Sequence, residues 1–311
     1  MRRQAALADL DAARGREQVA RDALDERIKV AFAQYYVASQ ALAVSREALA
    51  VDRGMRAAAE ARCAAGQGDQ AAVILALGEE TAAEVEIARL EGDCAAAREM
   101  LNALVARPAN APLSDPLRLR PVPATVLPTA SLVERARVGS PALAASGAEI
   151  GAAQARATLA ERAWYPDLTV GAGPLIQTNN RPPGVAATVG LNIPLPWGRE
   201  ASEQQAATAN LGAAQQRYEA ALLDIQSAVA EAREKLKAAQ RGETLVARKA
   251  LAEARAALKS LVADYAQGRG NLTAALEAQH RVHDLELTRL RLELDEQTTL
   301  AGIERLIGGE L

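Results

Sequence analysis

The chain contains one sequence pattern twice, at a single ungapped offset of 202 residues (268 minus 66). Residues 66–68 and 268–270 both read Gly-x-Gly, and residues 89–91 and 291–293 both read Arg-Leu-Glu. The correspondence extends over roughly 60 residues without a gap, which chance agreement between alanine-rich helices does not produce. A duplicated supersecondary unit is therefore the strongest constraint on the fold.

Each repeat copy predicts a long helix, a tight turn and a shorter return helix. No proline interrupts residues 1–65 or 199–267, so each of these ranges can form one continuous helix. The glycines that follow provide the left-handed backbone conformation with which helices commonly end. Return helices are expected over about residues 71–106 and 272–307.

The apolar residues of the long helices are spaced as in a coiled coil. In the first copy Tyr35, Leu42 and Leu49 recur every seven residues. In the second copy the interval from Leu236 to Leu251 is 15 residues, one more than two heptads. This interval predicts a stutter that unwinds the supercoil locally.

A region of different character separates the two copies. Six prolines fall within residues 108–128, which predicts an extended and irregular connection. Ser131 and Glu134 form a capping box that predicts the start of a short helix. The Ser-Pro pair at 140–141 predicts a second helix, which we expect to run to about Trp164.

Two stretches after this helix alternate in hydrophobicity. Residues 168–172 and 185–193 place an apolar residue at every second position, with small or polar residues between, which indicates strands with one apolar face. Such strands fit a transmembrane barrel around a water-filled lumen, or an edge hairpin packed on a soluble helix layer. Because two strands cannot close a barrel, the first alternative needs several chains. Trp197 fits either an interfacial aromatic belt or a plug at the helix–strand junction.

The overall composition excludes several functions. The net charge is -3 and the pI about 5.7, with basic and acidic residues interspersed, so there is no electrostatic footprint for nucleic acid. The sequence contains no run of 18 apolar residues, so it predicts no transmembrane helix. No apolar stretch follows the basic residues Arg2 and Arg3, so the export signal of a secreted protein is expected to lie outside this chain.

Candidate chemical sites are few. There is no Ser/His/Asp set, phosphate loop or metal-spaced cysteine cluster, so the sequence predicts no enzyme activity, no cofactor and no metal site. His280 and His283 have a spacing that can bind a metal ion. Since the first repeat copy lacks this pair, we expect them to be surface histidines. Cys63 and Cys94 are the only cysteines, and we expect them to be unpaired, buried small residues.

Three short stretches carry a resemblance to a known family. They are Trp-Tyr-Pro-Asp-Leu at 164–168, Ile-Pro-Leu-Pro-Trp-Gly-Arg at 193–199, and Tyr-Ala-Gln-Gly at 265–268. Together with the duplicated hairpins, they resemble the TolC-like outer-membrane efflux protein family over essentially the whole chain. The ending at 193–199 is most similar to the outer-membrane component of heavy-metal and other RND-type tripartite efflux pumps.

The resemblance implies a mainly α fold, in which two long antiparallel helical hairpins build an α-barrel and one transmembrane-type β-hairpin joins a barrel shared by a homotrimer. It implies a channel in outer-membrane lipid, continued by a helical tube in the periplasm. The chain would be a passive conduit that exports small solutes, such as metal cations or drugs. Its partners would be a periplasmic adaptor (a membrane fusion protein) and an inner-membrane efflux pump, with no nucleic acid.

The resemblance also implies roles for individual residues. The family's inner constriction uses the tyrosine of the turn, here Tyr265, and a carboxylate one to two helical turns beyond the tip, here Glu277. Ala274 stands at another position where an acid is common. The adaptor would contact the eight residues at the two hairpin tips: Gly66, Gln67, Gly68, Asp69, Gly268, Arg269, Gly270 and Asn271.

These assignments divide the chain into five parts. They are the first hairpin repeat (1–110), the Pro-rich equatorial connection (111–140), the helix leading to the strands (141–164), the β-hairpin of the outer-membrane barrel (165–198) and the second hairpin repeat (199–311).

The repeat offset also predicts a missing element. Subtracting it from Arg199 gives a position before Met1, so the first copy lacks a strand hairpin of its own. We therefore expect an N-terminally incomplete sequence rather than a helical tube with a reduced barrel. The alternative function is a structural coiled-coil protein, such as a periplasmic adaptor or scaffold.

Overall fold

The chain folds into two compact units. The computed structural model describes residues 2–114, 118–125, 127–175, 184–192 and 199–311. The strand unit comprises Met1–Ala20 and Ser140–Ile225, and the tip unit comprises Arg21–Gly139 and Gln226–Leu311. The long helices α1 (Arg2–Ala64) and α5 (Arg199–Leu245) each run from one unit into the other. The units therefore follow the packing of the helices and do not coincide with the repeat copies.

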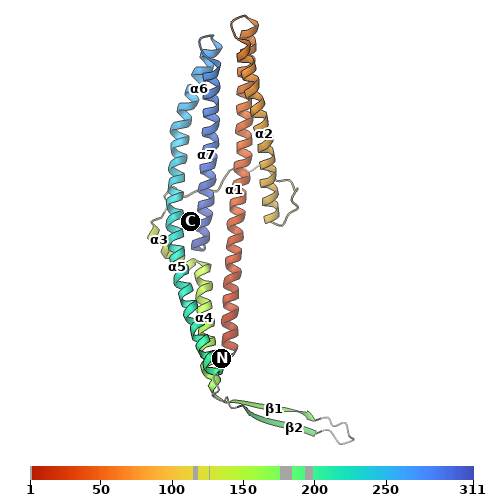
Figure 1. Cartoon of the computed structure of the whole chain (residues 1–311), viewed down its shortest axis with the longest axis vertical. Coiled ribbons are helices and arrows are strands. Elements are labelled where there is room, and N and C mark those ends of the chain that lie inside the picture. Colours follow the sequence, from red (N-terminus) through yellow and green to blue (C-terminus); the bar gives the residue numbers. More distant parts are fainter. Residues whose placement is uncertain (1, 115–117, 126, 176–183, 193–198) are drawn as a thin grey trace. The chain divides into compact units, whose positions relative to one another are not determined.

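The first predicted hairpin lies in the tip unit. There α1 runs antiparallel to α2 (Gln70–Leu104), as Figure 1 shows. Ion pairs join the two helices: Arg53 Nε lies 2.8 Å from Glu80 Oε1, and Arg46 Nη2 lies 2.7 Å from Glu91 Oε1. The observed helix bounds are within two residues of the predicted ones, which is the precision with which helix ends are defined.

The second hairpin has one irregular turn. It consists of α5, a π-helical turn (Val246–Ala250), α6 (Leu251–Ala266) and α7 (Leu272–Ile307). The irregularity predicted between Leu236 and Leu251 is present, but as a π turn rather than a stutter. A π turn inserts one residue into the helix, so it accommodates the single residue beyond two heptads. In the first copy, where the heptads are regular, α1 is α-helical from end to end.

The two hairpins meet along α1 and α7 in the tip unit. Ala41, Leu90 and Leu290 form one buried cluster at this interface, and Leu290 is only 1% exposed. Lys29 Nζ lies 2.7 Å from Glu304 Oε2, which adds an ion pair between the same helices. Small alanine side chains let the backbones approach closely, so a chain with few aromatic residues can still bury this interface.

The connection between the copies ends in a short helix. α3 (Thr129–Gly139) begins two residues before Ser131, so Ser131 lies in its first turn and is not the predicted N-cap. The amide of Leu132 already donates to the carbonyl of Pro128 at 3.2 Å. Leu132 is fully buried, and α3 packs against α7. The capping-box prediction was wrong because this tertiary contact extends the helix toward Pro128.

α4 (Pro141–Glu161) packs against the beginning of α1 in the strand unit. It starts at the predicted Ser-Pro pair and is followed by a 3₁₀ turn at Arg162–Trp164. A Cβ atom on Gly15 of α1 would lie 2.8 Å from the Cα of Ala145. The two backbones therefore approach so closely that glycine is required at this position.

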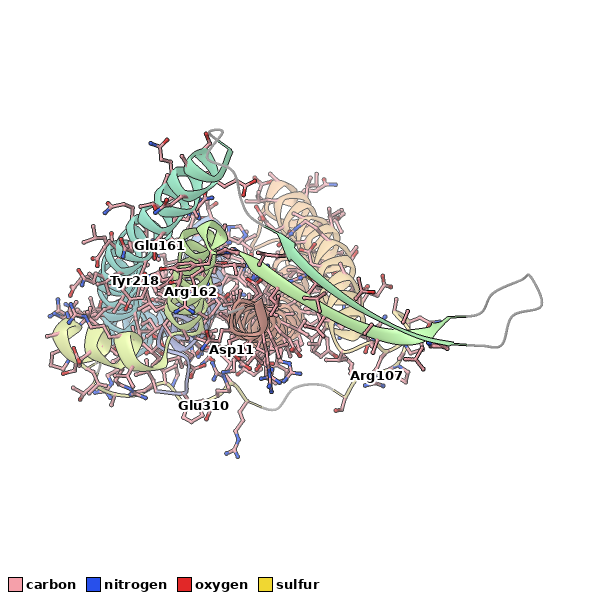
Figure 2. All side chains as sticks on the ribbon, turned by 90° about the horizontal axis from the view of Figure 1, so that it is seen from below. Asp11, Arg107, Glu161, Arg162, Tyr218 and Glu310 are labelled. Carbon is pink, nitrogen blue, oxygen red and sulfur yellow. The ribbon has the colours of Figure 1, made fainter. Side chains whose placement is uncertain are left out.

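The predicted strand pair is also present in the strand unit. β1 (Asp167–Leu175) and β2 (Gly184–Asn192) run antiparallel, with Val170 opposite Val189. Figure 2 shows the two strands as one paired ribbon that follows the end of α4. Trp197, the predicted membrane-interface residue, lies outside the described residues.

One face of the strand pair is apolar and exposed. Its larger side chains range from 62% exposed at Leu191 to 84% exposed at Val185. The opposite face carries small or polar residues such as Thr169 and Thr188. In the part of the chain that the structure describes, no helix covers the apolar face, so the alternative of an edge hairpin on a soluble helix layer is not observed. This face has the pattern of a strand pair in contact with lipid.

Candidate functional site

The first hairpin tip has a backbone geometry that its glycine makes possible. Gly66 has a φ of +70°, the left-handed conformation expected from the sequence. The amide of Gln67 donates to the carbonyl of Arg62 at 2.9 Å and closes the end of α1. Asp69 is the N-cap of α2, and its carboxylate accepts a hydrogen bond from the amide of Ala71 at 3.1 Å.

The second tip repeats this geometry at the equivalent positions. Gly268 has a φ of +77°. The amide of Arg269 donates to the carbonyl of Asp264 at 2.9 Å. Asn271 is the N-cap of α7, and its side chain accepts from the amide of Thr273 at 3.0 Å. The two sequence copies therefore form two copies of one turn.

The second glycine of the second tip turn is required by close packing, and this predicts an effect on stability. A Cβ atom on Gly270 would lie 2.8 Å from the backbone nitrogen of Tyr265, whereas a Cβ atom on Gly54, in the middle of α1, would meet nothing within 4 Å. We expect Gly270→Ala to lower the free energy of unfolding by about 1–3 kcal/mol. Gly54→Ala is the matched control and is expected to raise it by about 0.5–1 kcal/mol. Chemical unfolding of both variants measures the difference, and equal effects would contradict the close packing at the tip.

The tip residues form an accessible surface. All eight predicted adaptor-contact residues are exposed except Gly270, which is half-buried. They include an acidic side chain, Asp69, in the first turn and a basic one, Arg269, in the second. The two tips therefore offer similar backbone shapes with different charges.

A contact between the tips joins the two hairpins. Arg62, on the last turn of α1, donates from Nη1 to the backbone carbonyl of Tyr265 at 2.9 Å. Its guanidinium also lies over the Tyr265 ring, 4.6 Å from the centroid, in a cation–π contact. Tyr265 is a residue that the family resemblance implies, whereas Arg62 is not among the residues predicted from the sequence. The signal that could have found it is the repeat itself, because the counterpart of Arg62 is Asp264, a residue of opposite charge.

The two predicted constriction residues lie in different surroundings. Tyr265 is 6% exposed and belongs to a buried cluster that includes Met55 and Leu276. Glu277, the next residue along α7, is exposed. In the described part of the chain Glu277 makes no hydrogen bond or ion pair. Tyr265 is thus positioned to hold the hairpins together, and the Glu277 carboxylate is available to solvent or to another chain.

The two histidines do not both lie at the surface. The His280 side chain is 50% exposed, and its Nε2 lies 3.0 Å from Glu79 Oε2. His283 is half-buried, and its Nε2 lies 2.9 Å from the Ser45 hydroxyl. Burial lowers the pKa of His283 below its usual value, against the opposing effect of nearby carboxylates. The prediction of surface histidines was wrong for His283, because α1 packs on that face of α7.

The cysteines and the other candidate ligand residues provide no evidence of a chemical site among the described residues. Cys63 and Cys94 form no disulfide bond, and both are half-buried rather than buried. Within the described ranges, no three His, Cys, Asp or Glu side chains are grouped so that they could hold a metal ion. Of the helices that the structure describes, none is both long and apolar enough to cross a membrane.

The sequence of the chain matches one protein family. The family model for outer membrane efflux proteins matches residues 132–309, which is more than half of the sequence. The chain belongs to the outer membrane efflux protein family. A comparison with curated proteins found no match.

Solved structures of membrane proteins share the fold. A membrane protein from Pseudomonas aeruginosa is 24% identical, with a TM-score of 0.85, and the match covers 99% of this chain and 70% of that one. VceC from Vibrio cholerae is 20% identical, with a TM-score of 0.84 and coverage of 98% and 74%. The open-state MtrE outer membrane channel of Neisseria gonorrhoeae is 19% identical, with a TM-score of 0.83 and coverage of 98% and 70%. At these identities the likeness establishes the fold.

Family membership confirms the main predictions from the sequence. The fold is the TolC-like arrangement of long helical hairpins with a strand pair. The chain is an outer-membrane efflux component, and this family consists of conduits rather than enzymes. The alternative of a periplasmic adaptor or scaffold is set aside by the same match.

Proposed function

We propose that three copies of the chain form the outer-membrane duct of a tripartite efflux system, through which small solutes leave passively. The observation that carries this proposal is the exposed apolar face of β1 and β2. Two strands leave unpaired edges, which are not tolerated in lipid, so the strands of several chains must join into one closed barrel. The helices of the same chains then surround one continuous passage.

A second uncovered apolar surface supports assembly of several chains in the helical part. On α2, Ile74, Leu77 and Val85 are 63%, 52% and 66% exposed. Their spacing of three and eight residues places them on one face of the helix. Exposed apolar side chains that share one helix face mark a protein interface. We propose that a neighbouring chain of the trimer covers it.

The assembly predicts a specific effect of a charge on this surface. Val85→Glu is expected to convert most of the trimer to monomer, because the buried carboxylate would lose its hydration without gaining a partner. Val138→Glu is the matched control, since Val138 on α3 is also exposed, at 85%, but lies outside the stripe. Light scattering in detergent measures the mass of both variants. A trimeric Val85→Glu protein, or equal dissociation of both variants, would reject the α2 interface.

The tip surface is the proposed contact for the periplasmic adaptor. Its eight residues, Gly66 to Asp69 and Gly268 to Asn271, are at the ends of both hairpins and all but Gly270 are exposed. Rigid turns whose caps are satisfied internally can be recognised by shape, with little ordering cost on binding. An inner-membrane pump would deliver solutes to the duct through this adaptor.

The same region is the proposed gate. The contact between Arg62 and Tyr265 holds the first hairpin to the second in each chain, and opening would separate them. Three Glu277 carboxylates, one from each chain, would form a ring that favours cations and that repels itself when closed. The described residues contain no array of Met, Cys or His at the tips, so we propose a permissive duct, with metal cations and drugs selected by the pump.

A further inference from the structure

A small cavity lies in the tip unit where three helices meet. It has a volume of about 190 Å³ and is lined by α1, α2 and α7. Its ionisable and polar lining residues are Ser45, Asp52, Glu79, Glu86, Gln279, His280 and His283. The first hairpin contributes the carboxylates and the second hairpin contributes both histidines. The proposed duct makes no use of this cluster.

Asp52 is the most unusual member of the cavity. The residue is only 4% exposed, and its Oδ1 has no hydrogen-bond partner among the described residues. Burial raises the pKa of this carboxyl to about 6; His280 opposes the shift, while Glu79 and Glu80 add to it. A buried carboxylate without a partner is costly to keep charged.

The contacts between the hairpins at this cavity use its histidines. His280 Nε2 lies 3.0 Å from Glu79 Oε2, which joins α7 to α2. His283 Nε2 lies 2.9 Å from the Ser45 hydroxyl, which joins α7 to α1. The strength of the first contact depends on protonation, because a histidine–carboxylate pair is an ion pair only when the imidazole carries a proton.

We propose that this cavity is a proton-responsive joint, which packs the first hairpin more tightly against α7 in mildly acidic solution and loosens as the solution becomes alkaline. The joint lies within one chain, so it does not depend on the proposed trimer or on the proposed partners.

The direction of the pH dependence follows from the charged groups that line the cavity. At alkaline pH the Asp52 carboxylate is negative, and its buried Oδ1 has no hydrogen-bond partner among the described residues. On acidification Asp52 becomes neutral, which removes the cost of a buried charge between α1, α2 and α7. A carboxyl whose pKa is raised by folding binds its proton more tightly in the folded state. Its contribution to stability is therefore lost as the pH rises from the ordinary value through about 6.

The remaining charged groups around the cavity limit the pH range over which the joint is tight. Arg53 and Arg56 hydrogen-bond to Glu80, and Arg89 hydrogen-bonds to Glu86, which lowers the pKa of both carboxyls and keeps them charged. His283 acts in the opposite direction, since burial lowers its pKa in spite of Asp284 and Glu86. Its contribution is lost as the pH falls below the ordinary histidine value. The joint is therefore expected to be tightest in mildly acidic solution and weaker at stronger acidity.

Hydrogen exchange of the full chain tests this inference locally. The readout is the protection of amides in residues 79–86 and 279–286 between pH 5.5 and 8, corrected for the intrinsic pH dependence of exchange. In the wild type we expect protection in both segments to fall about 4-fold as the pH rises, which is the change that a carboxyl with its pKa raised to about 6 produces over this range. Asp52→Asn, which cannot ionise, is expected to keep high protection at pH 8. Asp25→Asn, at an exposed position of the same helix, is the matched control and should behave as the wild type.

His280→Gln tests the contact between α7 and α2 separately from Asp52, because glutamine can still donate to Glu79. This variant should keep the dependence of protection on pH, whereas Asp52→Asn should lose it. Wild-type protection that does not change with pH would overturn the proposal, even if a variant failed to fold. An Asp52→Asn protein with the wild-type pH dependence would overturn it as well. Loss of trimers or of conductance with these results intact would count only against the duct.

Discussion

Replacing Arg62 by alanine is expected to shift the duct strongly toward its open state. The substitution removes a charged hydrogen bond and a cation–π contact between the hairpins, together worth roughly 1–2 kcal/mol in each chain. If three chains open together, the ratio of open to closed ducts should rise on the order of 10²–10⁴-fold. Single-channel conductance in planar bilayers measures this change directly.

Three further variants make the gate prediction specific. Arg62→Lys keeps the charge but not the planar group that lies over the ring, so its effect should be intermediate. Tyr265→Phe keeps both the ring and the backbone carbonyl that Arg62 contacts, and should conduct as the wild type. Arg281→Ala, at an exposed position on α7, controls for loss of positive charge. An Arg62→Ala duct that stays closed would show that the contact between the tips does not hold the gate.

Replacing Val170 by arginine is expected to prevent stable insertion into the outer membrane. Val170 is 71% exposed and lies opposite Val189 on the apolar face of the strand pair. A charge on the lipid face of a barrel costs about 2–4 kcal/mol at the middle of the bilayer, and three chains would each bear this cost. The amount of trimer recovered from the membrane fraction measures the effect.

The control for this prediction lies on the other face of the same strands. Thr188 is paired with Gly171, on the small and polar face. Thr188→Arg should be tolerated, because that face is expected to line the water-filled lumen. Equal loss of both variants would contradict the assignment of lipid-facing and lumen-facing residues.

The long elements of the fold could be predicted from the sequence because their signals are local or repeated. The turn glycines predict where α1 ends and where α7 begins. The alternation of apolar residues at every second position predicts the strand pair. The number of residues between Leu236 and Leu251 predicts the position of the irregularity at Val246–Ala250, but it does not predict its form. A count shows that one residue is extra, but not whether the helix absorbs it as a stutter or as a π turn.

The features that the sequence did not reveal depend on contacts between distant residues. Arg62 and Tyr265 are separated by 203 positions, and the repeat marks Arg62 only as a residue that differs in charge from its counterpart Asp264, without showing that it contacts Tyr265. His283 was expected at the surface because the periodicity of α7 does not say that α1 covers that face. The local sequence predicts a helix cap at Ser131, because it contains no sign of the packing of α3 on α7.

Several copies of this chain are proposed to close one membrane duct. The mass of the full chain in detergent tests this proposal most directly. The proposal predicts a complex of three chains that requires detergent to remain in solution. A monomer whose mass and solubility do not change with detergent would contradict it.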